Sequence, residues 1–287
     1  MYKILVTGSD GQLGSELRFL SKEYKNYKYF FTNKKELDIC NSSSVQKFVN
    51  HHKINVIINC AAYTAVDRAE TEQELAYEIN HIGIENLAIV AKKNLCKLIH
   101  ISTDYIFDGT KTFPYTEQDI PNPQSIYGKT KLAGEQALKN INPENSIIIR
   151  TSWVYANIGD NFVKTMLRLG QNQTKINVVA DQMGSPTYAR DLAQIILQIL
   201  PQIENKIVAI FHFTNDGVCS WADFAIEIFK IKDINCKVNP ITTLDYPTPA
   251  KRPSFSVMDK RKIKEFFDLK IPNWKESLVR MLKTEKG

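Results

Sequence analysis

The opening stretch of the chain, residues 2–14, constrains the fold more than any other part of the sequence. The strand-forming run Ile4-Leu5-Val6 ends at Gly8, and Gly11 and Gly14 follow at three-residue spacing before a helical pattern begins. A strand, a glycine turn and a helix in this order are typical of a site for dinucleotide phosphates. Gly8 permits the tight turn, Gly11 lets the backbone approach a pyrophosphate, and Gly14 lets the helix pack on the sheet. The first unpaired N–H groups of the helix would then face the phosphates.

Apolar runs that alternate with helical patterns predict an α/β fold with a Rossmann-like, doubly wound parallel sheet. Residues 55–61 and 146–151 are continuous apolar strands, as expected where helices cover both faces of a parallel sheet. We place a dinucleotide-binding domain at residues 1–151 and a smaller, mainly substrate-binding lobe at residues 152–287, with some segments returning to the sheet. Other strands are predicted at 27–32, 97–102, 176–179 and 208–213, and helices at 12–24, 45–52, 72–93, 127–139, 161–171, 190–200, 221–229, 260–267 and 274–282.

Composition excludes several classes of protein. The formal net charge of +6 is spread along the 287 residues, so we expect no binding to nucleic acid. The five cysteines are odd in number and lack C-x-x-C spacing, which predicts neither a disulfide framework nor a zinc site. No apolar run approaches the length of a membrane span, and no signal peptide precedes the first strand. We therefore expect a cytoplasmic protein that does not bind membranes.

Tyr127 and Lys131 form a second informative pattern, because residues at i and i+4 share one face of a helix. An ammonium about 4 Å from a phenolate, at an effective dielectric near 20, stabilises it by about 4 kcal/mol. That is about three pKa units, enough to bring a phenol from about 10 towards neutrality, so that it can exchange protons. The alternative is an ordinary exposed pair. The strand 97–102 leads directly into Thr103, and a hydroxyl there sits where open α/β sheets bind ligands. Together the three side chains predict carbonyl reduction.

The end of the second strand bears on the choice of cofactor. The tip of this strand faces the adenosine ribose, where an acid would bond the 2′-hydroxyl of NAD and basic residues would accept the 2′-phosphate of NADP. Lys34 and Lys35 stand there, with no acid at residues 33–35. We therefore predict NADPH and keep NADH possible, the alternative being that these lysines form an exposed turn. His100 alternates with apolar neighbours and is interpreted as a satisfied core histidine.

Seven blocks of sequence carry a resemblance that covers nearly the whole chain. They are residues 8–14, 60–67, 102–109, 127–135, 150–155, 181–187 and 246–253. In this order they resemble the extended short-chain dehydrogenase/reductase superfamily, and within it the reductases that complete the synthesis of dTDP-L-rhamnose. The resemblance implies reduction of the C4 ketone of a dTDP-4-keto sugar, which would be the binding partner.

The same resemblance implies roles for individual residues. Thr103 would bond the C4 carbonyl, Tyr127 would give a proton to the forming alkoxide, and Lys131 would hold the nicotinamide ribose and lower the pKa of the phenol. Asp104 and Trp153 would contact the sugar, and Arg252 the diphosphate. Without the family, Trp153 could equally be core packing and Arg252 a surface ion pair. Besides Tyr127 and Lys131, the residues expected to contact the cofactor are Gly8, Gly11, Gln12, Leu13, Asp38, Ile39, Ala62, Tyr63 and Thr64.

Other functions remain open. Related dehydratases carry Thr-Asp-Glu after the fourth strand, whereas Tyr105 stands at the third position here, which argues against water loss. A nucleotide-sugar epimerase is an alternative, as is a non-catalytic subunit resembling the regulatory subunit of methionine adenosyltransferase. Some relatives pair through a metal held by surface carboxylates. Because Glu285 is the only acid among the last few residues, we predict no metal and expect a monomer or a homodimer.

Overall fold

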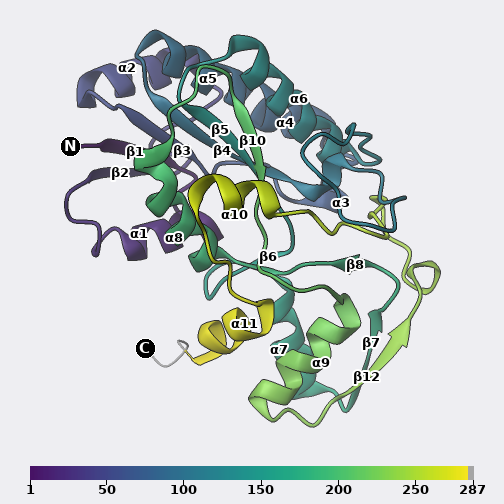
Figure 1. The fold of residues 1–287 in the computed structure, drawn as a ribbon. Coiled ribbons are helices and arrows are strands. Elements are labelled where there is room, and N and C mark those ends of the chain that lie inside the picture. Colours follow the sequence, from purple (N-terminus) through teal and green to yellow (C-terminus); the bar gives the residue numbers. More distant parts are fainter. Residues whose placement is uncertain (284–287) are drawn as a thin grey trace.

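A six-stranded parallel sheet forms the centre of the larger half of the molecule (Figure 1). The computed structural model describes residues 1–283, and residues 284–287, with Glu285 among them, lie outside the described part of the chain. The strand order is β10-β5-β4-β3-β1-β2, which confirms the predicted doubly wound α/β fold. The strands are β1 (Lys3–Thr7), β2 (Lys28–Thr32), β3 (Val56–Asn59), β4 (Lys97–Thr103), β5 (Ser146–Thr151) and β10 (Ala209–His212).

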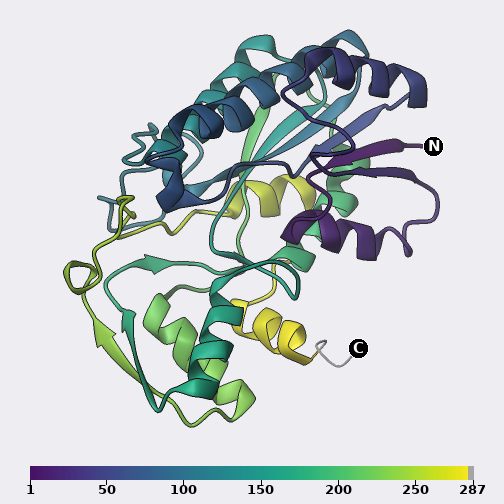
Figure 2. The same ribbon diagram turned by 180° about the vertical axis from the view of Figure 1, so that it is seen from behind.

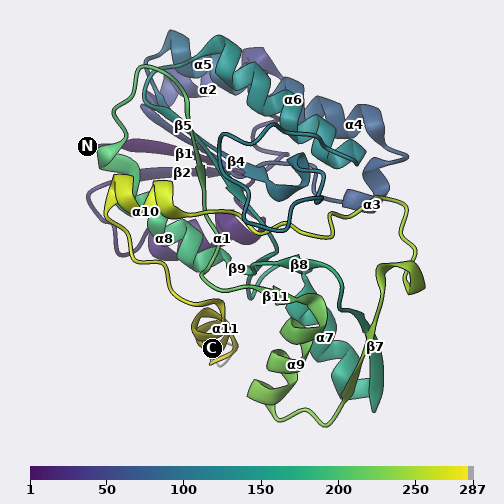
Figure 3. The same ribbon diagram turned by 45° about the vertical axis from the view of Figure 1, so that its right-hand side comes forward.

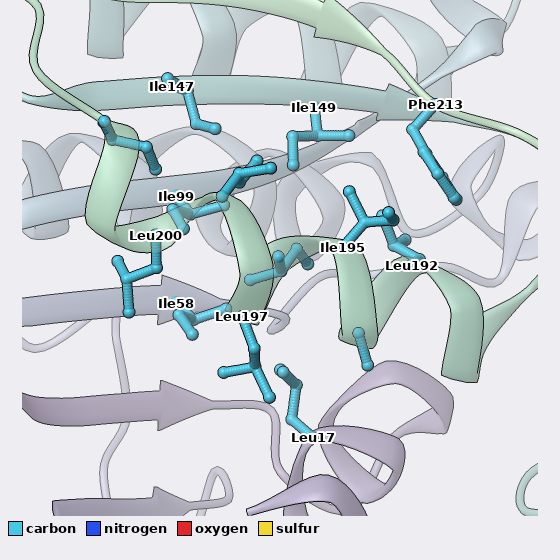
Figure 4. Close-up of a cluster of buried hydrophobic side chains, with 14 of the residues drawn as sticks. Leu17, Ile58, Ile99, Ile147, Ile149, Leu192, Ile195, Leu197, Leu200 and Phe213 are labelled. Atoms are coloured by element: carbon cyan, nitrogen blue, oxygen red, sulfur yellow. The ribbon is translucent and has the colours of Figure 1, made fainter. Parts of the chain in front are cut away.

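Helices cover both faces of this sheet (Figures 1 and 2). One layer holds α1 (Gln12–Leu20), α8 (Ala189–Ile199) and α10 (Arg261–Phe267), and the other holds α2 (Ser42–His52), α5 (Gly83–Lys93) and α6 (Ile126–Ile141). Successive side chains of a strand point to opposite faces, so the continuous apolar strands fill two cores. Ile58, Ile99 and Ile147 point towards α8 in Figure 4, whereas Ile57 and Leu98 belong to the opposite core.

The strand order places a topological switch at β1, which has β2 on one side and β3 on the other. The connections that leave the carboxyl ends of β1 and β3 therefore turn to opposite faces of the sheet, which opens a crevice between these two strands. Gly8 follows β1 with φ +63°, and a Cβ on it would lie 2.6 Å from the backbone nitrogen of Ala61. Glycine is thus required at this turn for two reasons, namely its positive φ and the close approach of the segment that follows β3.

The smaller half has a core of its own, built entirely from residues after 152. It contains α7 (Phe162–Asn172), α9 (Trp221–Lys232) and α11 (Trp274–Lys283), together with β7 (Lys175–Val179) paired in parallel with β12 (Lys237–Ile241). Short pairs join β6 (Val154–Tyr155) to β9 (Thr187–Tyr188) and β8 (Met183–Gly184) to β11 (Cys219–Ser220). These short strands and β12 were not predicted. Segments after residue 151 also supply α8, β10 and α10 to the larger half.

The helix predicted over residues 72–93 has three parts: α4 (Gln73–Tyr77), a π-helical turn at Glu78–Ile82, and α5. Asn80 lies in the π-helical turn, where its side chain bonds the backbone N–H and C=O of Tyr63 at 2.9 and 3.1 Å and the hydroxyl of Thr130 at 3.1 Å. The π-helical turn therefore links the segment after β3 to α6. None of the described helices combines the length and apolar character needed to cross a bilayer.

Substitution of Gly14 by alanine should destabilise the fold, whereas substitution of Gly11 should not do so strongly. A Cβ at Gly14 would lie 2.5 Å from the backbone oxygen of Gly8, whereas the nearest atom to a Cβ at Gly11 is that same oxygen at 3.3 Å. Overpacking against backbone costs about 1–3 kcal/mol and exceeds the gain of at most about 1 kcal/mol that alanine brings to a helix. Urea unfolding of both variants measures this difference, and equal free energies of unfolding would contradict it.

Candidate active site

A cavity of about 950 Å³ lies at the carboxyl ends of the central strands. Residues that follow β1, β3, β4 and β5 line it, as do the start of α6 and residues of the smaller half. This volume is at the upper end of the range for small-molecule sites and suits two ligands side by side. The position agrees with the rule that open α/β sheets bind ligands at the switch point, outside the carboxyl ends of their strands.

The glycine corner forms one end of the cavity, and most residues expected to contact a cofactor lie along it. α1 begins at Gln12 with Gly11 as its N-cap, so the N–H groups of its first turn lack partners within the helix. The side chain of Gln12 bonds the backbone oxygen of Val154 and the side chain of Asn161, which ties this corner to the smaller half. The predicted cofactor residues that line the cavity are Gly8, Gly11, Gln12, Leu13, Asp38, Ile39, Ala62, Thr64, Tyr127 and Lys131.

Tyr63 differs from the other predicted cofactor residues, because the cavity lining formed by the described residues does not include it. Its hydroxyl donates to Glu72 at 2.6 Å and its backbone N–H donates to Asn80 at 2.9 Å. Both bonds turn Tyr63 towards α4 and the π-helical turn. Lys34, from the pair predicted to select NADPH, does line the cavity.

Thr103 and Asp104 lie at the end of β4 and are both buried. The Thr103 hydroxyl donates to Asp104 at 3.0 Å and accepts from the backbone N–H of Tyr105 at 3.2 Å. Burial raises the pKa of Asp104 to about 6, although bonds from Ser256 and Thr103 oppose this rise. Within the described part of the chain, the second carboxylate oxygen of Asp104 has no hydrogen-bond partner. An unsatisfied buried oxygen in a cavity wall is suited to accept a bond from a ligand hydroxyl.

Tyr127 and Lys131 lie one turn apart on α6, and both side chains line the cavity. Ser125 caps the helix by accepting from the N–H of Gly128 at 3.1 Å. The Lys131 ammonium donates to the backbone oxygen of Ile101 at 2.7 Å, and burial lowers its pKa to about 8. Burial raises the pKa of Tyr127 to about 12, against the opposing hydrogen bond with Thr103. This differs from the expected acidification of the phenol by Lys131, because burial dominates and the negative charge of Asp104 raises the pKa further.

His100 lies in β4 behind this site and is fully buried. The side-chain nitrogen of Asn59 lies 3.1 Å from Nδ1 of His100, and the Asn59 oxygen accepts from Thr7 at 2.5 Å. The Asn59 nitrogen therefore donates to Nδ1, so the ring carries its proton on Nε2. Nε2 has no partner among the described residues. His100 is thus a core residue as predicted, but only one of its two ring nitrogens is satisfied.

Aromatic side chains of the smaller half form the opposite wall. Trp153 has φ +49°, an uncommon value for a residue other than glycine, and its ring stacks on Trp221 with centroids 3.5 Å apart. Phe162 packs against Trp221 at 4.6 Å, and all three line the cavity. Trp153 was predicted, whereas Trp221 and Phe162 were not, because no local motif marks them.

Arg252 also lines the cavity and forms an ion pair with Asp67 at 2.7 Å. Arg252 thus forms the ion pair that was the alternative interpretation, and its expected contact with a diphosphate stays a prediction. Asp67 was not predicted as a site residue. Across residues 1–283 no cluster of His, Cys, Asp and Glu is arranged to hold a metal ion.

Comparison with known proteins gives one consistent family. The family model described as the RmlD substrate binding domain matches residues 2–286. The dTDP-4-dehydrorhamnose reductase of Aggregatibacter actinomycetemcomitans is 44% identical over 97% of both chains, and that of Escherichia coli is 37% identical over 97% of this chain and 96% of its own.

Solved structures agree with this result. A dTDP-4-dehydrorhamnose reductase from Clostridium acetobutylicum is 46% identical with a TM-score of 0.94, covering 99% of this chain and 100% of its own. The enzyme of the same name from Bacillus anthracis, solved in complex with NADP, is 40% identical with a TM-score of 0.93 and the same coverage. The chain therefore belongs to the dTDP-4-dehydrorhamnose reductase (RmlD) family of the extended short-chain dehydrogenase/reductase superfamily.

Proposed function

We propose that this chain reduces the C4 ketone of dTDP-4-dehydro-L-rhamnose to dTDP-L-rhamnose with NADPH. The observation that carries the proposal is the convergence of Thr103, Tyr127 and Lys131 on the cavity that also contains the glycine corner. Whole-length relatives named as reductases favour this reaction over an epimerase or a regulatory subunit. We further propose a cytoplasmic enzyme that acts as a monomer or a homodimer.

The residues of the cavity fit NADPH. The first turn of α1 offers free N–H groups beside Gly11, where a diphosphate can approach the backbone. Lys34 lines the cavity near the end of β2, where it would neutralise the 2′-phosphate that distinguishes NADPH from NADH. When bound, the dihydronicotinamide supplies a hydride to C4 of the sugar.

Tyr127 acts as the proton donor in this proposal. With a pKa of about 12 it keeps its proton at neutral pH, as a general acid must. A secondary alcohol is a weaker acid than a phenol, even a buried one, so transfer from Tyr127 to the forming alkoxide is favourable. The low phenol pKa expected from the sequence is therefore not needed for reduction.

The neighbours of Tyr127 orient the carbonyl and hold charge. Thr103 would turn its single O–H from Asp104 to the C4 oxygen and stabilise the charge that develops there. The Lys131 ammonium lies one turn along α6, where it would bond the nicotinamide ribose and stabilise the phenolate left after proton transfer. Asp104 and Trp153 would position the sugar, and Arg252 its diphosphate.

Replacement of Gly11 by alanine should weaken NADPH binding without unfolding the protein. The added methyl group would point at the space that the diphosphate needs, and overpacking of this kind weakens binding about tenfold or more. Titration of protein fluorescence with NADPH measures the dissociation constant. Unchanged affinity in a folded Gly11→Ala variant would place the phosphates elsewhere.

Replacement of Tyr127 by phenylalanine should lower kcat at least about 100-fold, because it removes the general acid. NADPH affinity should be kept. The assay follows NADPH absorbance with the dTDP-4-keto-6-deoxyhexose as substrate, and NADH is run in parallel to test cofactor preference. Tyr105→Phe is the comparison variant, since the Tyr105 ring lies edge-on to that of Tyr127 at 5.5 Å. Loss of activity in Tyr105→Phe with activity retained in Tyr127→Phe would reverse the assignment of the proton donor.

The rate of reduction should fall as the pH rises above about 8. A free lysine keeps its charge to about pH 10.4, but burial lowers the pKa of Lys131 to about 8, so its ammonium is lost as the pH passes that value. Deprotonation removes the cation that holds the ribose and stabilises the phenolate. We expect kcat/KM to be near its plateau at about pH 7, to reach about half of the plateau at about pH 8, and then to fall about tenfold per pH unit. A plateau that extends to pH 10 would exclude this role for Lys131.

A further inference from the structure

The loop that returns from the smaller half to α10 passes beside α3 (Val66–Ala69), as Figure 3 shows. We call residues 246–258 the return loop. Its later part is held by backbone hydrogen bonds, from Met183 to Ser254 at 2.8 Å and from Tyr115 to Val257 at 2.8 Å. Its earlier part meets α3 through Ala250 and Arg252.

Asp67 on α3 is the group that holds this earlier part. Its Oδ2 accepts from Nη2 of Arg252 at 2.7 Å, and its Oδ1 accepts from Nη1 at 3.0 Å and from the Ala250 N–H at 3.2 Å. The side chain of Arg252 is 25% exposed and that of Asp67 is 38% exposed, so water reaches the pair only in part. The pair is bidentate, which fixes the orientation of the guanidinium as well as its position.

The bonding pattern leaves one edge of the guanidinium free. Arginine carries five N–H donors in a rigid plane. Nη1 uses its two on Asp67 and the backbone oxygen of Ala250, and Nη2 uses one on Asp67. The Nε donor and the second Nη2 donor remain, and these two point the same way along one edge of the planar group. Across the described chain neither has an acceptor, and Arg252 lines the cavity.

We propose that Asp67 is a positioning residue that holds the end of the Arg252 guanidinium and so presents the free edge to the substrate diphosphate. This inference deepens the proposed function and rests on it for the identity of the ligand. Phosphate oxygens match the spacing of that edge as well as carboxylate oxygens do. A guanidinium already fixed by Asp67 loses less conformational freedom when the diphosphate binds.

The position of Arg252 also suits the reaction. Its charge faces Tyr105, whose ring contacts that of Tyr127. Glu70, three residues beyond Asp67, accepts from the Ile126 N–H at 2.9 Å at the start of α6. The segment that holds Arg252 is thus fixed to the helix that carries the proton donor, so a diphosphate bound at Arg252 is set at a constant distance from Tyr127.

The opposite role for Asp67 predicts the opposite result. If Asp67 instead competed with the diphosphate for Arg252, removal of its charge would strengthen binding. Asp67→Asn and Asp67→Glu distinguish the two roles. Asparagine removes the charge, whereas glutamate keeps it but moves the carboxylate by one methylene, so a positioning role predicts weaker binding in both variants.

The experiment measures binding of dTDP and of thymidine, which lacks phosphates, to the full chain by isothermal titration calorimetry. We expect each Asp67 variant to bind dTDP about tenfold more weakly while thymidine and NADPH affinities are unchanged. Arg252→Lys should lose at least as much, and Asp67→Asn should add little to it in the double variant. Asp233→Asn, a charge removal at the exposed end of α9, is the control and should bind like the wild type.

Three results for the variants would overturn the inference: tighter dTDP binding by Asp67→Asn, an equal loss for thymidine, or full additivity with Arg252→Lys. Asp67→Glu gives the answer if Asp67→Asn does not fold. A wild-type protein that binds dTDP but does not oxidise NADPH with the keto sugar would contradict the proposed reaction alone, since the binding comparison needs no turnover. A wild-type protein that does not bind dTDP would overturn the inference itself.

Discussion

A buried ion pair between Arg150 and Glu135 fixes the helix on which the candidate chemistry depends. Arg150 is the penultimate residue of β5 and Glu135 lies on α6. Their side chains are 2% and 1% exposed, with nitrogen and oxygen 2.7 Å apart. Removal of one member of such a pair costs about 3–5 kcal/mol, because the other charge stays buried without a partner. Nε and Nη2 of Arg150 each donate to one carboxylate oxygen of Glu135, which sets the rotation of α6 as well as its distance from the sheet. Tyr127 and Lys131 reach the end of β4 because of that rotation. Burial favours the loss of charge from Lys131, which lies one turn away from Glu135 on α6. The negative charge of Glu135 opposes that loss.

Local patterns in the sequence sufficed for the central sheet and for the helices and β7 of the smaller half, but not for its short strands or β12. Strands such as β3 and β5 are apolar throughout because both of their faces are covered, and that signal does not depend on partners far away in the chain. The two-residue strands have no such signal, since each exists only through its distant partner. β12 contains Pro240, which argues against a strand in the interior of a sheet, but it pairs with β7 alone and so tolerates the missing donor. The π-helical turn around Asn80 likewise depends on bonds to Tyr63 and Thr130.

The same division applies to the candidate site. Glycine spacing and the Tyr127–Lys131 pair are local patterns, and they led to the residues at the sheet end of the cavity. Trp221 and Asp67 come from segments far apart in the sequence, and only the folded chain brings them to one cavity with Trp153 and Arg252. The degree of burial was equally hidden from the sequence, and it reverses the expected shift in the pKa of Tyr127.

The stacked rings of Trp153 and Trp221 have a consequence for how this protein can be observed. The chain has three tryptophans, and the third, Trp274, is 3% exposed in the core of the smaller half. Two indoles stacked with centroids 3.5 Å apart couple their electronic transitions, whereas Trp274 lies outside the cavity lining among the described residues. Near-ultraviolet circular dichroism should therefore contain an exciton signal from the cavity wall, superimposed on a constant contribution from the core. Binding of a sugar or a base against that wall would alter the exciton signal. The contribution of Trp274 would stay unchanged and serve as an internal reference.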